Sequence, residues 1–127
     1  MRRMLITTIS VFVLAMAVCG VTMANVQRVT GHMRHMRSEA ILHMDAGEIQ
    51  LVEETLMQLA NYLNENQGWL EIVCNHGDLH QIKGEIIDAQ ASVEFGIEDD
   101  FYQAVYRFGE GLDHIASIEE ISWSNLC

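Results

Sequence analysis

The stretch GHMRHMRSEAILHM, residues 31–44, carries three histidines and three methionines, whose side chains bind soft transition metals and haem iron. If this stretch is helical, His32 and Met36 lie one turn apart on the same side and can share one metal ion. His43 lies eleven residues beyond His32, about 16 Å along a helix axis, and is therefore too far away to bind the same ion. A shared metal site in this stretch is thus limited to His32 and Met36.

A copper ion held by His32 and Met36 needs further ligands, because two ligands are too few for a tight site. A facing helix would have to supply them, from residues such as His80 or His114. A helix surface that faces haem is a second alternative. The third is packing, since methionine side chains fill irregular gaps in hydrophobic cores. The residue types alone leave copper, haem and packing as alternatives.

An apolar stripe predicts the helix that carries these residues, because its members recur at steps of three or four residues. The members are Val26, Val29, Met33, Met36, Ala40 and Met44. Gly47 follows after Asp45 and Ala46 and is a typical C-terminal cap. Met33 and Met36 therefore belong to the side of the helix that a bundle would bury.

Three further stripes predict three more helices, and the absence of proline removes the strongest helix breaker. The second helix is expected to begin at about Glu48 and to end at NENQG, residues 64–68. Residues 69–74, WLEIVC, fit either a helical turn or a buried extended segment. The third helix is expected to have Asp78 as its N-cap, and the fourth to begin at about Phe101. Together these elements predict an all-α, up-down four-helix bundle in one domain.

The N-terminus combines a basic Met-Arg-Arg start, an apolar run over residues 5–18 and the small-residue stretch CGVTMAN. This order is typical of a secretory signal peptide, because the apolar run is short for a bilayer span. We expect cleavage after Ala24 to remove residues 1–24 and to leave an exported, for example periplasmic, bundle of residues 25–127. An uncleaved anchor and a lipoprotein attached through Cys19 are the alternatives.

Acidic residues dominate the expected mature chain. All 18 Asp and Glu residues follow residue 24, whereas two of the seven Lys and Arg residues, Arg2 and Arg3, precede it. Five positive and 18 negative side chains give a formal charge of −13. This charge disfavours nucleic acids and, after cleavage, membrane surfaces, and it attracts cationic ligands or a basic redox partner protein. A homodimer is a further alternative for the assembly.

No recognisable constellation for catalysis occurs in the sequence. It lacks Gly-x-Ser-x-Gly, His-Glu-x-x-His and phosphate-binding glycine motifs, and no Glu is followed three residues later by His, as di-iron bundles require. We therefore expect a protein that is not an enzyme. In an oxidising compartment, Cys74 and Cys127 can pair with each other.

Two stretches of the chain resemble the class II c-type cytochromes, the cytochrome c prime group. Residues 31–63, GHMRHMRSEAILHMDAGEIQLVEETLMQLANYL, look like the first two helices of that family, in which a Met-rich helix ends at a glycine. Residues 99–116, DDFYQAVYRFGEGLDHIA, are similar to its penultimate helix. The resemblance implies an exported haem protein for electron transfer or small-gas binding. It also implies that Met33 or Met36 either binds the iron or lines the pocket.

The haem-attachment motif of that family, Cys-x-x-Cys-His, does not occur in this sequence. Cys127 is the last residue and stands where the first cysteine of the motif is expected, so the resemblance assigns haem attachment to it. Either the chain is a truncated version that lacks the rest of the motif, or the bundle carries no covalently bound haem. The prediction is therefore a haem protein, with a copper-binding bundle and a cofactor-free structural or interaction bundle as alternatives.

Overall fold

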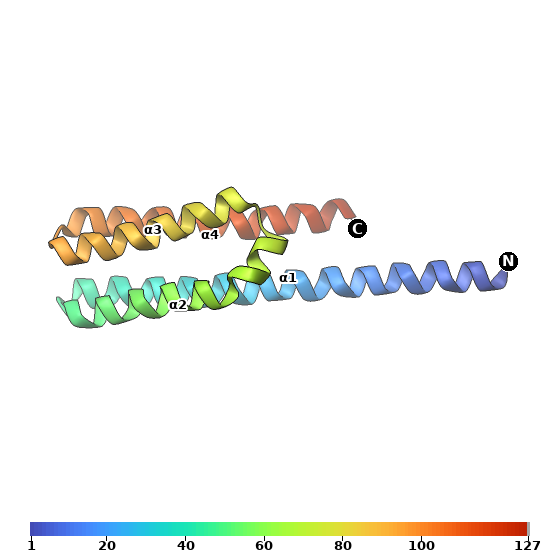
Figure 1. Cartoon of the computed structure of the whole chain (residues 1–127), viewed down its shortest axis with the longest axis horizontal. Coiled ribbons are helices and arrows are strands. Elements are labelled where there is room, and N and C mark those ends of the chain that lie inside the picture. The colour runs from blue at the N-terminus through green and yellow to red at the C-terminus, as the bar shows by residue number, and fades with distance from the viewer. Residues whose placement is uncertain (127) are drawn as a thin grey trace.

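The computed structural model describes the backbone of residues 1–126 and the side chains of residues 1–117. These residues form four helices, α1 (Arg2–Asp45), α2 (Ile49–Val73), α3 (His76–Phe95) and α4 (Glu98–Leu126). Figure 1 shows the helices running side by side in alternating directions, with α1 extending well beyond the other three. Among the described residues there is no strand, so the predicted all-α four-helix bundle is confirmed.

Each helix packs against two others. α1 and α3 do not contact each other among the principal contacts of the described residues, and each of them contacts α2 and α4. The α1–α2 and α3–α4 turns lie at one end of the bundle, and the end of α4 points in the direction in which α1 projects (Figure 1). α1 and α4, which are far apart in sequence, are therefore antiparallel neighbours.

The core consists of the stripes that the sequence predicts. All six members of the first stripe are buried. Met33 and Met36 belong to a larger cluster with residues of the other three helices, such as Leu63, Ile82 and Phe108. A smaller cluster lies toward the α1–α2 and α3–α4 turns and comprises Ala40, Met44, Val52, Leu56, Ala89, Val93, Phe101, Ala104 and Val105. Helical spacing alone therefore identified the residues that α1 contributes to the core.

Two glycines with left-handed backbone form the turns at one end of the bundle. Gly47 follows α1 with a φ of 77°, and Gly96 follows α3 with a φ of 72°. A residue with a Cβ adopts this conformation only at a cost, so glycine suits both positions. The Glu48 amide donates to the His43 carbonyl at 2.9 Å, which satisfies an acceptor at the end of α1. Gly47 therefore terminates α1 as expected, directly after the cap residue Ala46.

The predicted end of α2 at NENQG is wrong, because the helix continues to Val73. Gln67 Nε2 donates to the Glu71 carboxylate one turn later at 2.9 Å, and Leu70 is 1% exposed. Gly68 costs the helix about 1 kcal/mol relative to alanine. Burial of a leucine side chain contributes about 2 kcal/mol and so outweighs that cost. The WLEIVC segment is therefore helical as far as Val73.

Two predicted helix starts are also wrong. The N-cap of α3 is Asn75, whose side-chain oxygen accepts from the Gly77 amide at 2.8 Å, and Asp78 lies in the first turn instead. α4 begins at Glu98 rather than at about Phe101. Its first turn holds three carboxylates, which the positive end of the helix dipole stabilises. Asn75 and Asp78 are both residue types that cap helices, and the wrong one of the two was predicted as the N-cap of α3.

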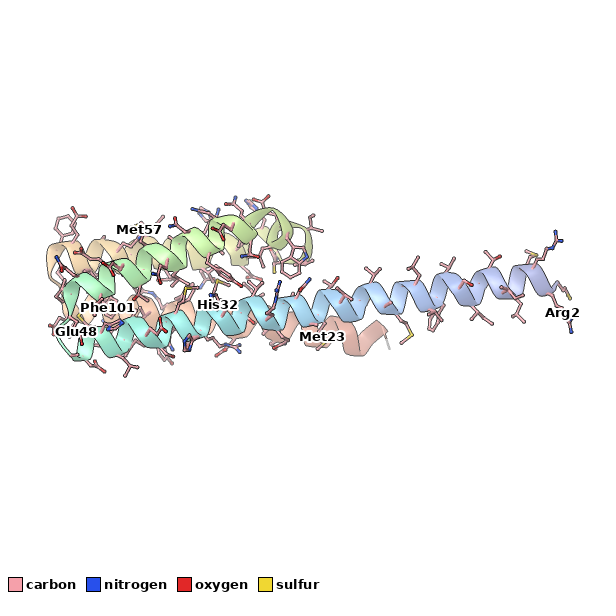
Figure 2. All side chains as sticks on the ribbon, turned by 90° about the horizontal axis from the view of Figure 1, so that it is seen from below. Arg2, Met23, His32, Glu48, Met57 and Phe101 are labelled. Carbon is pink, nitrogen blue, oxygen red and sulfur yellow. The ribbon has the colours of Figure 1, made fainter. Side chains whose placement is uncertain are left out.

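The first half of α1 stands outside the bundle. Figure 2 shows it as one continuous helix that runs from the bundle out to Arg2. Residues 1–18 are exposed, and the first buried residue of α1 is Val26. Among the described helices, α1 alone contains a stretch that is long and apolar enough to cross a membrane. The predicted signal peptide and its alternatives all concern this half of the helix.

Candidate functional site between α1 and α4

The His/Met stretch is divided between the core and the surface. Met33 is 0% exposed and Met36 is 5% exposed, and both lie in the larger core cluster. His32 is exposed, and its ring centroid lies 4.4 Å from that of Tyr62 on α2. Met33 and Met36 thus lie in the core, whereas His32, the other member of the predicted metal pair, lies at the surface.

The predicted additional metal ligands on the facing helices lie elsewhere. His80 is exposed on α3, and His114 on α4 lies 3.6 Å from the Asp78 carboxylate. Among the described residues, no group of three His, Cys, Asp or Glu side chains is close enough to hold a metal ion. The copper site of His32 and Met36 stays a prediction, which a titration can test.

The two methionines that the resemblance places at the haem, Met33 and Met36, are enclosed in an apolar cluster. Cys127, which the resemblance assigns to haem attachment, lies outside the described residues. The haem prediction stays a prediction. A Soret absorption band in the protein, matured in a host competent for haem attachment, is the observation that tests it.

A polar groove of about 430 Å³ lies between α1 and α4, where the sequence predicted no site. Its lining residues are Arg34, Arg37, Ser38, Tyr106, Gly109, Glu110 and Asp113. Arg34 and Arg37 come from one turn of α1, and both are partly buried. Of the five Lys and Arg residues that follow residue 24, two therefore gather in one groove.

Arg37 is held against α4 by a bond to the backbone. Its Nε donates to the Val105 carbonyl at 2.5 Å. Gly109 leaves the space for this contact, because a Cβ there would lie 2.8 Å from Nε and 2.9 Å from Cζ of Arg37. Among the described residues, no carboxylate lies within ion-pair distance of Arg37. Arg37 is therefore a positioned cation without a counter-ion in this part of the chain.

Arg34 is the second guanidinium of the groove. Its Nη2 lies 2.7 Å from Oδ1 of Asp113, and this pair links α1 to α4. Its Nε is buried and has no hydrogen-bond partner among the described residues. A buried donor without an acceptor costs about 1–3 kcal/mol. The groove thus contains a buried hydrogen-bond donor that has no acceptor among the described residues.

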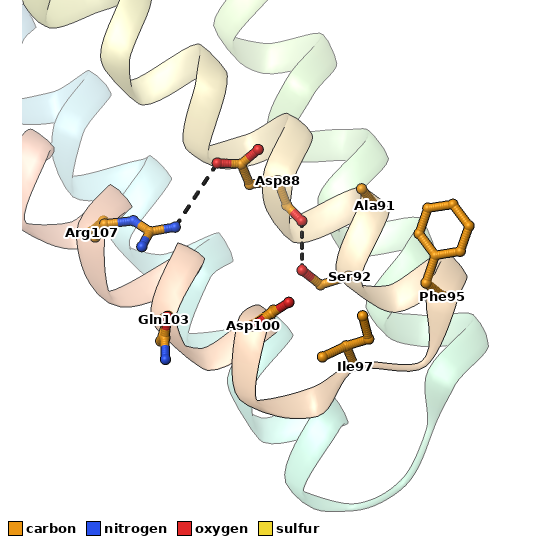
Figure 3. A pocket seen from close by; sticks show the side chains of 8 residues that line it. All are labelled: Asp88, Ala91, Ser92, Phe95, Ile97, Asp100, Gln103 and Arg107. Atoms are coloured by element: carbon orange, nitrogen blue, oxygen red, sulfur yellow. Dashed lines mark hydrogen bonds and ion pairs between the residues drawn. The ribbon is translucent and has the colours of Figure 1, made fainter.

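A groove of about 360 Å³ between α3 and α4 offers a comparison (Figure 3). Arg107 at its edge lies 2.9 Å from Glu85 and 3.9 Å from Asp88. The hydrogen bond to Glu85 and the charges of these carboxylates raise the pKa of Arg107 above its already high ordinary value. Arg107 therefore has its counter-ions within the chain, whereas Arg37 does not have one in the described residues.

Two signals of the α1–α4 groove were present in the sequence. Arg34 and Arg37 are three residues apart, which places them on neighbouring positions of one helix face. Gly109 stands inside a helical pattern, where glycine costs about 1 kcal/mol relative to alanine and often marks a packing requirement. Neither signal shows that α1 and α4 are neighbours, so the site could not be assembled from sequence alone.

No known protein family matches the chain, and no curated protein matches it. Inference of function therefore rests on the geometry and charge of the groove.

Proposed function

We propose that this chain is a helical binding module that holds a small carboxylate-bearing ligand in the groove between α1 and α4. The observation that carries the proposal is the state of Arg37. It is partly buried, bonded to the Val105 carbonyl and given space by Gly109, yet no carboxylate in the described residues pairs with it. A cation that loses hydration favours an anionic partner, because burial of an unpaired charge is costly.

Guanidinium geometry supports a carboxylate as that partner. The group is planar and presents its N–H donors in a fixed fork that matches the two oxygens of a carboxylate. Because Nε of Arg37 is already bonded to α4, the remaining donors are held in place and less side-chain entropy is lost on binding. Arg34 adds a second positive charge, and Ser38 and Tyr106 line the same groove.

The size and rim of the groove support a small ligand. A volume of about 430 Å³ falls in the range of small-molecule sites, which is about 300–1,000 Å³. Glu110 and Asp113 are also among the lining residues, and their charges disfavour ligands with many negative groups. A monocarboxylate or a small dicarboxylate fits these constraints better than a polyphosphate or a nucleic acid.

Isothermal titration calorimetry of the full chain in mild detergent tests the proposal with acetate, succinate and citrate, and with uncharged succinamide as the control ligand. Arg37→Gln is expected to weaken binding of the best carboxylate about 10-fold or more, because hydrogen bonds to charged groups contribute about 1.5–3 kcal/mol. Arg107→Gln removes the same charge outside the groove and should leave the affinity unchanged. Equal losses in both variants, or no carboxylate binding at all, refute the proposal.

A second variant separates the position of Arg37 from its charge. In Gly109→Ala the new Cβ would lie 2.8 Å from Nε of Arg37, so the guanidinium must move while the net charge stays the same. Carboxylate binding is expected to weaken as it does in Arg37→Gln. Gly84→Ala on α3 is the matched control, because no atom lies within 4 Å of a Cβ there. Normal affinity in Gly109→Ala contradicts a positioned Arg37.

A further inference from the structure

The projecting half of α1 is apolar on every side. Val11, Phe12, Val13 and Leu14 are consecutive residues, and each is between 58% and 65% exposed. Successive side chains of an α-helix point about 100° apart, so these four residues surround the helix axis. A partner helix or a second copy of this chain would cover one side of α1, whereas the hydrocarbon of a bilayer contacts all sides.

The uncharged part of this half is long enough for a bilayer. Residues 4–24 contain no Asp, Glu, Lys or Arg, and all of them lie in α1. At about 1.5 Å per residue they extend about 31 Å, and the hydrocarbon core of a bilayer is about 30 Å thick. Their most apolar window has a mean hydropathy of 2.4, and none of it is buried. The short run of residues 5–18, on which the signal-peptide prediction rests, is thus part of a longer span.

The threonine side chains of this half are compatible with hydrocarbon. All of its threonines donate their hydroxyls to the carbonyl four residues earlier, at 2.7, 2.7 and 2.8 Å for Thr7, Thr8 and Thr22. A hydroxyl in hydrocarbon is costly unless it finds an acceptor within the protein. These three hydroxyls have their acceptors on the helix itself, so the span needs no partner to satisfy them.

α1 enters the bundle without a break. Ala24, after which cleavage was predicted, lies inside the helix. Val26 is 0% exposed and Val29 is 1% exposed, so the turn that follows Ala24 is already part of the core. In the intact chain, the peptide bond after Ala24 thus lies within one continuous helix that joins the apolar half of α1 directly to the core.

We propose that residues 4–24 of α1 are a permanent membrane anchor, a bilayer-spanning helix that carries the bundle directly on its end. Arg2 and Arg3 stand at the far end of the span, where cationic side chains meet lipid phosphates. This inference does not rest on the carboxylate groove, and either proposal can fail without the other.

The mass and the fractionation of the full chain, expressed in a bacterial host, test the anchor. The intact chain of 14.4 kDa is expected in the membrane fraction. It should resist extraction by alkaline carbonate, which strips peripheral proteins, and should be released by mild detergent. A soluble protein that begins near Asn25 would overturn the proposal, and so would an intact chain that carbonate releases.

Two sets of variants sharpen the test. Ala24→Phe blocks a signal-peptidase site, so the natural chain and this variant should have the same length; a shorter natural chain overturns the proposal. Val13→Lys combined with Leu14→Lys places two charges at the middle of the span and should make most of the protein extractable by carbonate. Met57→Lys combined with Ile72→Lys adds the same charges at exposed positions of α2 and should change nothing. Unchanged carbonate resistance in the Val13 and Leu14 variant overturns the anchor.

Discussion

Replacement of Gly111 by alanine is expected to destabilise the bundle although alanine is the better helix former. A Cβ at Gly111 would lie 2.7 Å from Cγ2 of Ile82, where α4 packs against α3. Non-bonded carbon atoms rest at about 3.5–4.0 Å, so α4 or the Ile82 side chain must move by about 1 Å. Ile82 is 0% exposed and belongs to the larger core cluster, so its movement disturbs other core residues.

The magnitude follows from two opposing effects. Overpacking of a core costs about 1–3 kcal/mol, and replacement of a helical glycine by alanine returns up to about 1 kcal/mol. Gly84→Ala on α3 has the second effect alone, because no atom lies within 4 Å of its Cβ. We expect Gly84→Ala to be more stable than the natural chain by about 0.5–1 kcal/mol. Gly111→Ala should be less stable than Gly84→Ala by about 1–3 kcal/mol.

Urea unfolding of the full chain in mild detergent, followed by far-ultraviolet circular dichroism, measures these differences. Ile82→Leu removes the branch that carries Cγ2, so the double variant Gly111→Ala, Ile82→Leu should recover part of the lost stability. The interaction energy in that double-mutant cycle should be about 0.5–3 kcal/mol. If Gly111→Ala stabilises the bundle as much as Gly84→Ala does, α3 and α4 are not as close at Gly111 as the 2.7 Å distance requires.

Three further expectations concern single side chains. Tyr102 on α4 donates to Asp45 on α1, and this hydrogen bond, together with burial and nearby negative charges, raises the pKa of Tyr102 to about 12. Because folding favours the neutral phenol, this stabilisation is complete below pH about 10 and is lost as the pH rises toward 12. The free energy of unfolding of Tyr102→Phe should therefore decrease less than that of the natural chain as the pH rises from about 10 to about 12, in denaturation measured across this range. Met33→Leu conserves volume and should change the free energy of unfolding by less than about 1.5 kcal/mol; a larger loss would show a role beyond packing. Titration with Cu(I) tests the predicted copper site, which is refuted if His32→Ala, Met36→Ala binds as tightly as the natural chain.

The buried faces of the helices were predictable from spacing because each helix turns one apolar face toward the core that all four share. Every third or fourth position from Val26 to Met44 is apolar, and all six of these positions are buried. Helix ends were less predictable, since they depend on contacts beyond the local sequence. α2 continues through Gly68 because Leu70, farther along, is buried in the larger core cluster.

The candidate site was less predictable than the fold. The residue types predicted a shared site at His32 and Met36, but the two residues differ in burial. The imidazole of His32 lies at the surface, and the thioether of Met36 lies in the core. The contact between Arg37 and Gly109 joins helices that are distant in sequence. Its detection requires knowing that α1 and α4 are neighbours, and a single sequence with four similar stripes does not determine that pairing.

The acidic composition and the proposed carboxylate site act at different distances. From residue 25 onward, the bundle carries 18 acidic and five basic side chains, and their summed field repels anions that approach from solution. Dissolved salt screens that field over about 8 Å at physiological ionic strength. A carboxylate bound to Arg37 would meet its guanidinium at about 3 Å, inside a partly water-excluded groove where screening is weaker. The net charge therefore affects mainly how fast an anion arrives, and the contacts at Arg37 decide whether it stays. For this reason the net charge yields an expectation about partners that meet the surface and gives no information about the groove.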